Sequence, residues 1–314
     1  MPFKRIDYRD LDLFYVLNPD PAQMANATHD RLPASNPMKP GLPTLVFVHA
    51  AGANVTSWVK QLSDPRLASQ FNMFAMDARF HGFTKGGPRT EHTLKNSAEC
   101  VMASLDEMNF DSYSIYGEGV HGAVIAAWIA CMRPEKVTSL LLASPGYMRE
   151  PPHVVEMLRG VQEELLINKH DGAGDKSGTL PSGALEDIVA YFVGTSERLA
   201  QQRIVLGQEF QKRYGTGHSG HDVGWLFQAV YERTPIPRDQ LASITCPVLI
   251  LRGGDDKIVC PESACQEWQS HFTGAKGGAA IHTISGAPSR ISLSDSNIVN
   301  RILMQFVQRA IVSK

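Results

Sequence analysis

The sequence predicts an α/β fold in which a mostly parallel, doubly wound sheet is interrupted by a helical insertion. Between residues 44 and 143, short apolar runs alternate with segments of helical periodicity, the pattern of parallel strands joined by crossover helices. Between residues 145 and 243 the strand-like runs disappear and helical periodicity dominates. The chain therefore divides into a core, residues 1–144 and 244–314, and a helical cap or lid insertion, residues 145–243.

The elements follow from the position of the apolar residues. Residues 3–8 and 12–17 alternate between apolar and polar, which indicates two antiparallel strands. The run TLVFVH at residues 44–49 is almost wholly apolar, which is typical of a strand buried on both faces. The further expected strands span residues 72–76, 112–116, 137–143, 247–251 and 279–284. The expected helices span residues 57–62, 93–108, 122–131, 153–168, 185–193, 196–213, 222–233 and 297–312, and residues 18–41 are expected to form a surface loop.

Composition restricts the classes of function. The 314 residues are 43% hydrophobic and 20% charged, with a net charge of −2 and no basic stripe, which argues against nucleic acid as a partner. No apolar run approaches the roughly 18 residues of a membrane span, and the N-terminus lacks the apolar stretch of a signal peptide. The five cysteines show no paired metal-ligand spacing, so free thiols, a cytoplasmic location, no metal and no cofactor are expected.

The most informative segment is a predicted strand-to-helix turn at residues 115–122, which reads IYGEGVHG. Four further motifs follow the same order as in one known superfamily. They are VHAAG at residues 48–52, DARFHGFT at 77–84, RPEKV at 133–137 and RGGDD at 252–256. With these five matches the chain resembles the α/β-hydrolase superfamily over nearly its whole length. The turn at 115–122 then corresponds to the nucleophile elbow, G-x-S-x-G, of those enzymes.

The resemblance implies roles for individual residues, and two of them are unusual. Gly119 stands where the nucleophilic serine is expected, and Ser289 stands where the catalytic histidine is expected. Asp256 matches the triad acid, or serves only as a turn-capping carboxylate. The backbone amides of Ala51 and Val120, in a loop where Ala50 replaces the usual glycine, would form the oxyanion hole. Backbone donors survive any change of side chain.

His121 offers a possible substitute for the missing groups. A bulky imidazole two residues after Gly119 suggests a changed, relaxed elbow, since no strained serine has to be presented. His121 could act as a general acid or base, alone or in a dyad with Ser289, or it packs at the helix start with a backbone partner. Glu118 and His49 are expected to be structural. The string GTGHSGHD at residues 215–222 is interpreted as a loop.

Three functions remain open at this stage. The first is non-hydrolytic acid/base or oxyanion chemistry, of isomerase, cyclase or lyase type, on a small hydrophobic molecule in a capped pocket. The second is a non-catalytic pseudo-hydrolase that binds a ligand or a protein partner, as in the N-myc downstream-regulated family, which also has glycine at the elbow. The third is hydrolysis through a relocated nucleophile or an activated water, with Ser219, Ser289 and Cys260 as candidates. The oligomeric state is open.

Overall fold

The computed structural model describes residues 3–6, 10–28, 31–86, 92–170, 182–210 and 220–312. Its strands are β1 (Phe3–Ile6), β2 (Leu11–Leu17), β3 (Thr44–Val48), β4 (Asn72–Met76), β5 (Lys85–Gly86), β6 (Tyr113–Glu118), β7 (Val137–Ala143), β8 (Val248–Gly253) and β9 (Ala279–Ile284). They form one sheet with the order β1-β2-β4-β3-β6-β7-β8-β9, and β5 pairs with β2. All pairs from β4 to β9 are parallel, whereas β2 is antiparallel to its neighbours. The predicted α/β fold with a mostly parallel sheet is confirmed.

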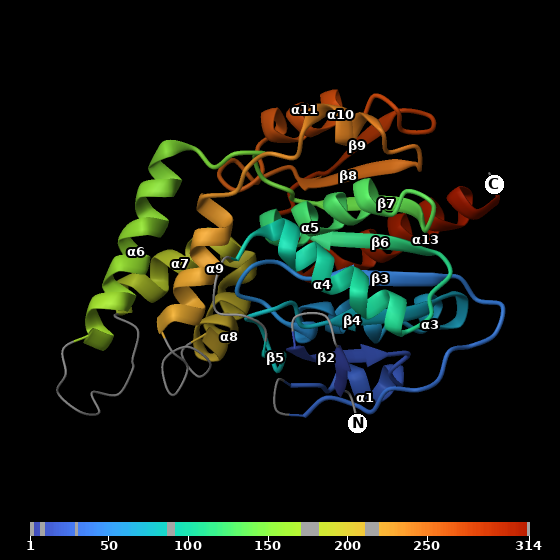
Figure 1. Ribbon diagram of the computed structural model, residues 1–314, viewed down its shortest axis with the longest axis horizontal. Helices are drawn as coiled ribbons and strands as arrows, with labels where there is room; N and C mark the ends of the chain where they lie inside the picture. Colours follow the sequence, from blue (N-terminus) through green and yellow to red (C-terminus); the bar gives the residue numbers. More distant parts are fainter. Residues whose placement is uncertain are drawn as a thin grey trace.

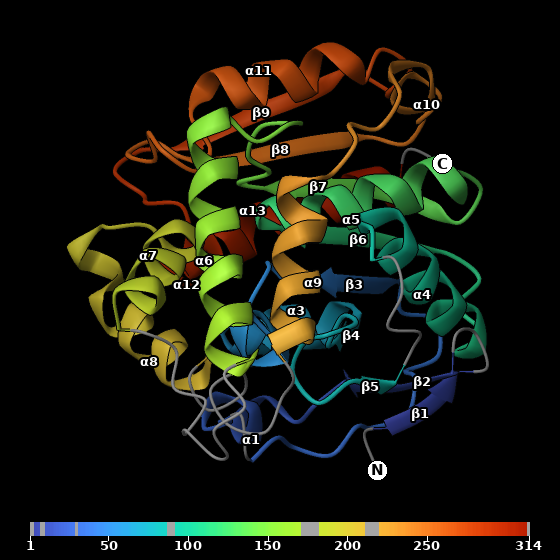
Figure 2. The ribbon, with the colours of Figure 1, turned by 60° about the vertical axis from the view of Figure 1, so that its left-hand side comes forward.

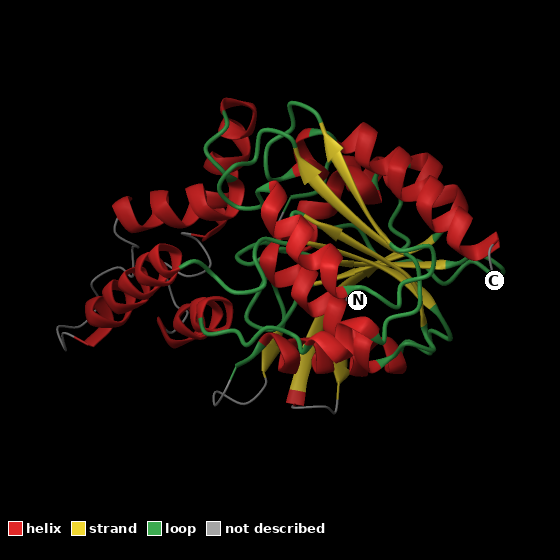
Figure 3. Ribbon diagram, turned by 90° about the horizontal axis from the view of Figure 1, so that it is seen from above, coloured by secondary structure: helices red, strands yellow, loops and turns green. Residues whose placement is uncertain are grey.

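Helices cover both faces of this twisted sheet (Figure 3). They are α1 (Pro21–Ala25), η2 (Val55–Trp58), α2 (Val59–Leu62), α3 (Pro65–Gln70), α4 (Leu94–Glu107), α5 (Gly119–Met132), α10 (Arg238–Ala242), α11 (Glu262–His271), α12 (Ile291–Ser294) and α13 (Ser296–Val312). Side chains alternate along each strand, so β3 sends Val46 toward the apolar cluster of α4 and α5, and Phe47 toward that of α2 and α13. Continuous burial of β3 follows from this double cover.

A second group of helices lies between β7 and β8 in the chain. It comprises α6 (Pro152–His170), α7 (Ser182–Val193), η3 (Glu197–Leu199), α8 (Ala200–Phe210) and α9 (Gly220–Tyr231). In Figures 1 and 2 these helices stand together beside the sheet. The described part of residues 145–243 contains no strand, as the sequence predicts.

Several local expectations were wrong. α5 begins at Gly119 rather than at residue 122, because the turn passes directly from β6 into the helix. The expected loop at residues 18–41 contains α1, whose first turn is capped by Asp20 and begins with Pro21. The short helices α3 and α10, the strand β5 and the helix α11 were not predicted from the sequence, and the expected helix at 196–213 begins with the separate turn η3.

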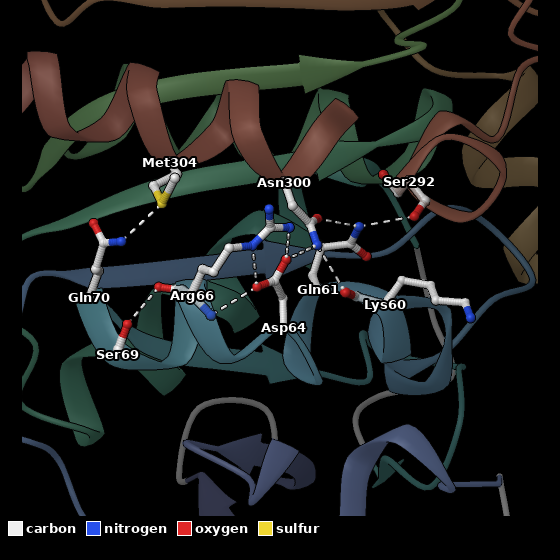
Figure 4. A network of polar contacts seen from close by, with 9 residues as sticks. All are labelled: Lys60, Gln61, Asp64, Arg66, Ser69, Gln70, Ser292, Asn300 and Met304. Atoms are coloured by element: carbon white, nitrogen blue, oxygen red, sulfur yellow. Dashed lines mark hydrogen bonds and ion pairs between the residues drawn. The ribbon is translucent and has the colours of Figure 1, made fainter. Parts of the chain in front are cut away.

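A buried polar network fastens α2 and α3 to α12 and α13 (Figure 4). The Asn300 amide donates to Asp64 Oδ2 at 2.9 Å, and the Gln61 amide donates to Asn300 Oδ1 and to the Ser292 carbonyl, both at 2.9 Å. Asp64 also accepts from Arg66, and these hydrogen bonds lower its pKa to about 2 although burial opposes the shift. The network fixes the segment that carries Ser289. Within the described residues, no helix has the length and apolar character to cross a membrane.

Candidate functional site

The turn between β6 and α5 keeps the close strand–helix packing of an elbow. A Cβ on Gly117 would lie 2.2 Å from the Gly122 carbonyl oxygen, and a Cβ on Gly122 would lie 2.3 Å from the Val48 carbonyl oxygen. Both positions therefore require glycine, since real Cβ atoms do not approach backbone so closely. Between them, Gly119 has φ = +67°, in the left-handed region that glycine adopts without strain. The turn keeps its sharp backbone course, but glycine at position 119 carries it without the strain that a serine would have.

Ala50 occupies the space that a side chain at position 119 would need. β3 pairs with β6 so that Val48 lies opposite Gly117, and this register brings the loop after β3 beside the turn. A Cβ on Gly119 would lie 2.8 Å from the Ala50 Cβ. Ala50 is buried at 3% exposure, so it has little room to withdraw. Position 50, where the resembled superfamily usually has glycine, is thus alanine in a chain whose position 119 has no side chain to accommodate.

The two expected oxyanion donors border this turn. Val120 is the second residue of α5, and first-turn amides have no acceptor inside their own helix. Ala51 lies in the loop after β3, which is held by the turn from Ala53 N to Ala50 O at 3.1 Å. The Gly52 amide donates to His81 Nε2 at 3.1 Å and further fixes the loop. Hydrogen bonds therefore hold the loop on one side of Gly119, and the first turn of α5 follows it on the other side.

His121 lies beneath this loop and not in an open pocket. Its side chain is fully buried, and its Nδ1 donates to the His49 carbonyl oxygen at 3.2 Å. Burial lowers the pKa of His121 to about 4, so the imidazole is neutral near pH 7. Its Nε2 has no hydrogen-bond partner. This placement agrees with a packed histidine that has a backbone partner.

Three histidines gather here, and the ring nitrogens of two of them, His49 and His81, are already engaged. His49, His81 and His121 offer nitrogens within 4.8 Å of one another. The Nε2 of His49 accepts from Ala78 N at 2.9 Å, and its Nδ1 contacts the Ala50 carbonyl at 2.8 Å. His81 likewise contacts the Arg79 carbonyl at 2.8 Å through Nδ1, in addition to its bond from Gly52. A carbonyl can only accept, so in His49 and His81 Nδ1 is protonated and the Nε2 lone pair is occupied. Of the three histidines only His121 keeps a nitrogen lone pair without a partner, which is fewer than the three or four ligands of a protein metal centre.

The remaining triad candidates are also engaged elsewhere. Asp256 accepts backbone N–H groups from Ile258, Val259 and Cys260 at 2.9–3.2 Å. Burial raises its pKa, and these three hydrogen bonds oppose the rise. Ser289 donates its hydroxyl to the Val193 carbonyl at 2.6 Å. The Asp256 carboxylate thus caps its own turn, and the Ser289 hydroxyl is bonded to the end of α7.

The proposed dyad of His121 and Ser289 does not form in this structure. His121 is bonded to the loop after β3, whereas Ser289 is bonded to the end of α7. The Asp256 carboxylate faces its own turn, where it accepts from Ile258 N and Cys260 N. The geometry thus joins His121 to His49 and His81, and leaves Asp256 and Ser289 apart from it. Residues 215–219 lie outside the described residues, and His221 is in α9.

A buried ion pair beside the turn was missed by sequence reasoning. Arg290 Nη2 lies 3.3 Å from Glu118 Oε2, with both side chains at 5% exposure or less. Glu118 Oε1 also accepts from Ser292 N at 3.2 Å. Glu118 was expected to be structural, but no partner was assigned to it. The available signal was an arginine next to the apolar residue Ile291, in a loop expected to reach the elbow.

Comparison with known proteins identifies the family. A family model described as the alpha/beta hydrolase fold matches residues 43–283, and the chain belongs to this family. The putative carbamate hydrolase RutD of Klebsiella pneumoniae is 24% identical over 237 residues, which cover 76% of this chain and 82% of that protein. The 3-oxoadipate enol-lactonase 1 of Acinetobacter baylyi is 24% identical over 225 residues, which cover 69% of this chain and 72% of that protein.

Solved structures share the same fold. The enol-lactonase from Burkholderia xenovorans LB400 superposes with a TM-score of 0.72 at 14% identity, over 98% of this chain and 100% of that chain. A hydrolase from Pseudomonas aeruginosa PA01 gives a TM-score of 0.71 at 20% identity, over 97% of each chain. At these identities the likeness shows the fold alone.

Proposed function

We propose that this protein acts on a small, largely apolar carbonyl compound without forming an acyl-enzyme. The observation that carries the proposal is the close approach of Ala50 to Gly119. Glycine at position 119 offers no nucleophilic side chain, and the Ala50 Cβ occupies the space where such a side chain would begin. The amides of Ala51 and Val120 would hold the carbonyl or enolate oxygen. Chemistry of this kind stabilises a developing oxyanion through backbone donors alone, as in an isomerase, cyclase or lyase.

Residues 145–243 would act as the cap that closes over this site. The contact between Ser289 and Val193 supports the assignment, since it ties the end of α7 to the loop beside the elbow. The relatives are named for a carbamate and an enol lactone, which are both small carbonyl compounds. A carbonyl ligand at the amides of Ala51 and Val120 is consistent with that chemistry.

A second candidate is a non-catalytic binding protein of the same fold. It is favoured by the engagement of every candidate proton carrier: Asp256 with three amides, Ser289 with Val193, and His121 with His49. His121 Nε2 has no hydrogen-bond partner among the described groups. Proton transfer by His121 needs a substrate atom at roughly 2.6–3.2 Å, which its burial opposes.

Two experiments test these functions. A fluorophosphonate probe, which labels activated serines, should leave the wild-type protein unmodified; stoichiometric labelling would overturn the absence of an acyl-enzyme. Exchange of α-protons of a lactone probe in D2O then separates the two candidates. Exchange that is lost in His121→Gln supports the enzyme, whereas lactone binding without exchange supports the binding protein.

A further inference from the structure

A separate pocket lies where α8 approaches the segment after β3. Its volume is about 390 Å³, within the range of small-molecule sites. Its lining includes Val193, Val205 and Leu206 together with side chains of the segment after β3, which are Ala53, Asn54, Thr56, Ser57, Val59 and Lys60. Gly119, Val120 and Ala50 are not among its lining residues. The pocket is thus distinct from the turn that carries the proposed oxyanion hole.

The described walls of this pocket are apolar and positively charged. Seven aliphatic side chains line it: Ala27, Ala53, Val59, Val193, Val205, Leu206 and Leu293. The polar lining consists of hydroxyl and amide groups together with Lys60 and Arg290, and none of the described lining side chains is acidic. Such a surface favours a ligand with an apolar body and an anionic group.

The two cations differ in how they are compensated. Arg290 is buried and its Nη2 faces Glu118, but its Nε and Nη1 have no acceptor among the described groups. Lys60 is exposed, and its ammonium extends away from the neighbouring polar network (Figure 4). Among the described residues Lys60 has no ion pair. One charge is therefore balanced by Glu118, and the positive charge of Lys60 remains at the rim.

We propose that this pocket binds a medium-chain carboxylate, with the chain between Val193 and Val205 and the carboxylate toward Lys60. Burial of each methylene of the chain is favourable, which favours an aliphatic body over a small inorganic anion. The carboxylate lies beside Lys60, whose positive charge has no ion-pair partner among the described residues. The inference goes beyond the proposed function, because it concerns a second site.

Calorimetric titration of the full-length protein with octanoate tests the proposal. Saturable one-to-one binding is expected, with octanol weaker by about tenfold, or roughly 1.4 kcal/mol. Val205→Glu places a carboxylate in the lining of the pocket. The affinity for octanoate should fall by at least about tenfold, because the two carboxylates repel each other. Lys60→Gln should reduce the preference for octanoate over octanol.

Ile204→Glu is the matched control. Ile204 is absent from the pocket lining, whereas Val205 belongs to it. Their side chains are 54% and 44% exposed, so a glutamate at either position costs little folding stability. Both substitutions add the same charge to the same turn of α8. Octanoate affinity should stay unchanged in Ile204→Glu. Equal binding of octanol and octanoate, equal loss in the two glutamate variants, or no saturable binding would each overturn the proposal. Fluorophosphonate labelling does not bear on it, so the two proposals fail independently.

Discussion

The Cβ of Ala50 lies where a side chain on Gly119 would have to begin, with 2.8 Å between the two Cβ positions. Ala50 lies in the loop after β3 and Gly119 is the first residue after β6, and these two strands are neighbours in the sheet. The two residues fit together only while position 119 is glycine. The packing around position 119 therefore leaves no room for a nucleophilic side chain. Restoring the serine alone would introduce a clash.

The first prediction concerns this contact. Gly119→Ala should destabilise the fold by about 1–3 kcal/mol, because it combines overpacking with a positive φ. Ala50→Gly should relieve the clash, so the double variant is more stable than the sum of the two single effects by about 1 kcal/mol. Urea denaturation measures the coupling. Gly160→Ala in α6 is the control, since a Cβ there meets nothing within 4 Å; strict additivity at Ala50 and Gly119 would contradict the packing argument.

The second prediction extends the contact to activity. Gly119→Ser with Ser289→His should remain inactive toward p-nitrophenyl esters, because Ala50 still crowds the serine. The triple variant that adds Ala50→Gly should gain fluorophosphonate labelling and slow ester hydrolysis. Initial rates, measured with a check of folding by circular dichroism, decide the result. Activity in the double variant that equals the triple variant would show that Ala50 is not the barrier.

The third prediction is the pH dependence of stability from His121. Its pKa is about 4 in the folded protein and 6.5 when unperturbed, so the unfolded chain binds more protons between these values. Stability should therefore fall as the pH drops from 6.5 toward 4, with a total loss of about 3 kcal/mol from this group. His121→Gln keeps a donor for the His49 carbonyl and should flatten that part of the profile. An unchanged slope in the variant would place the titration elsewhere.

The parallel sheet could be predicted because its strands are continuous apolar runs. β3 and β7 are buried along their whole length, and such runs report burial directly. The short helices α3 and α11 lack a long periodic pattern and were missed. The contact between Ala50 and Gly119 depends on the register of β3 against β6, which sequence spacing does not specify. For the same reason the partner of Glu118, 172 residues away at Arg290, was not assigned.

The fourth prediction uses the network of Figure 4. Asp64 caps α3 and also accepts from Asn300 on α13, whereas Asp20 caps the exposed end of α1 and accepts from Gln23 alone. Asp64→Ala should cost more than the typical capping value of about 1 kcal/mol, and Asp20→Ala should not exceed it. Thermal unfolding of both variants measures the difference. Equal losses would mean that the link from α3 to α13 adds no stability.

The last prediction concerns the ion pair next to the elbow. Arg290→Met leaves the Glu118 carboxylate buried without its charged partner, and removal of one member of a buried pair typically costs about 3–5 kcal/mol. The exposed pair of Arg133 and Asp106, with the atoms 3.2 Å apart, provides the control. Arg133→Met should cost less than about 1 kcal/mol, since solvent screens an exposed charge. Denaturant titration of both variants at neutral pH separates the two environments. If Arg290→Met proved as mild as Arg133→Met, the backbone bond from Ser292 to Glu118 would suffice to hold the buried carboxylate, and the arginine would be available to a ligand in the adjoining pocket.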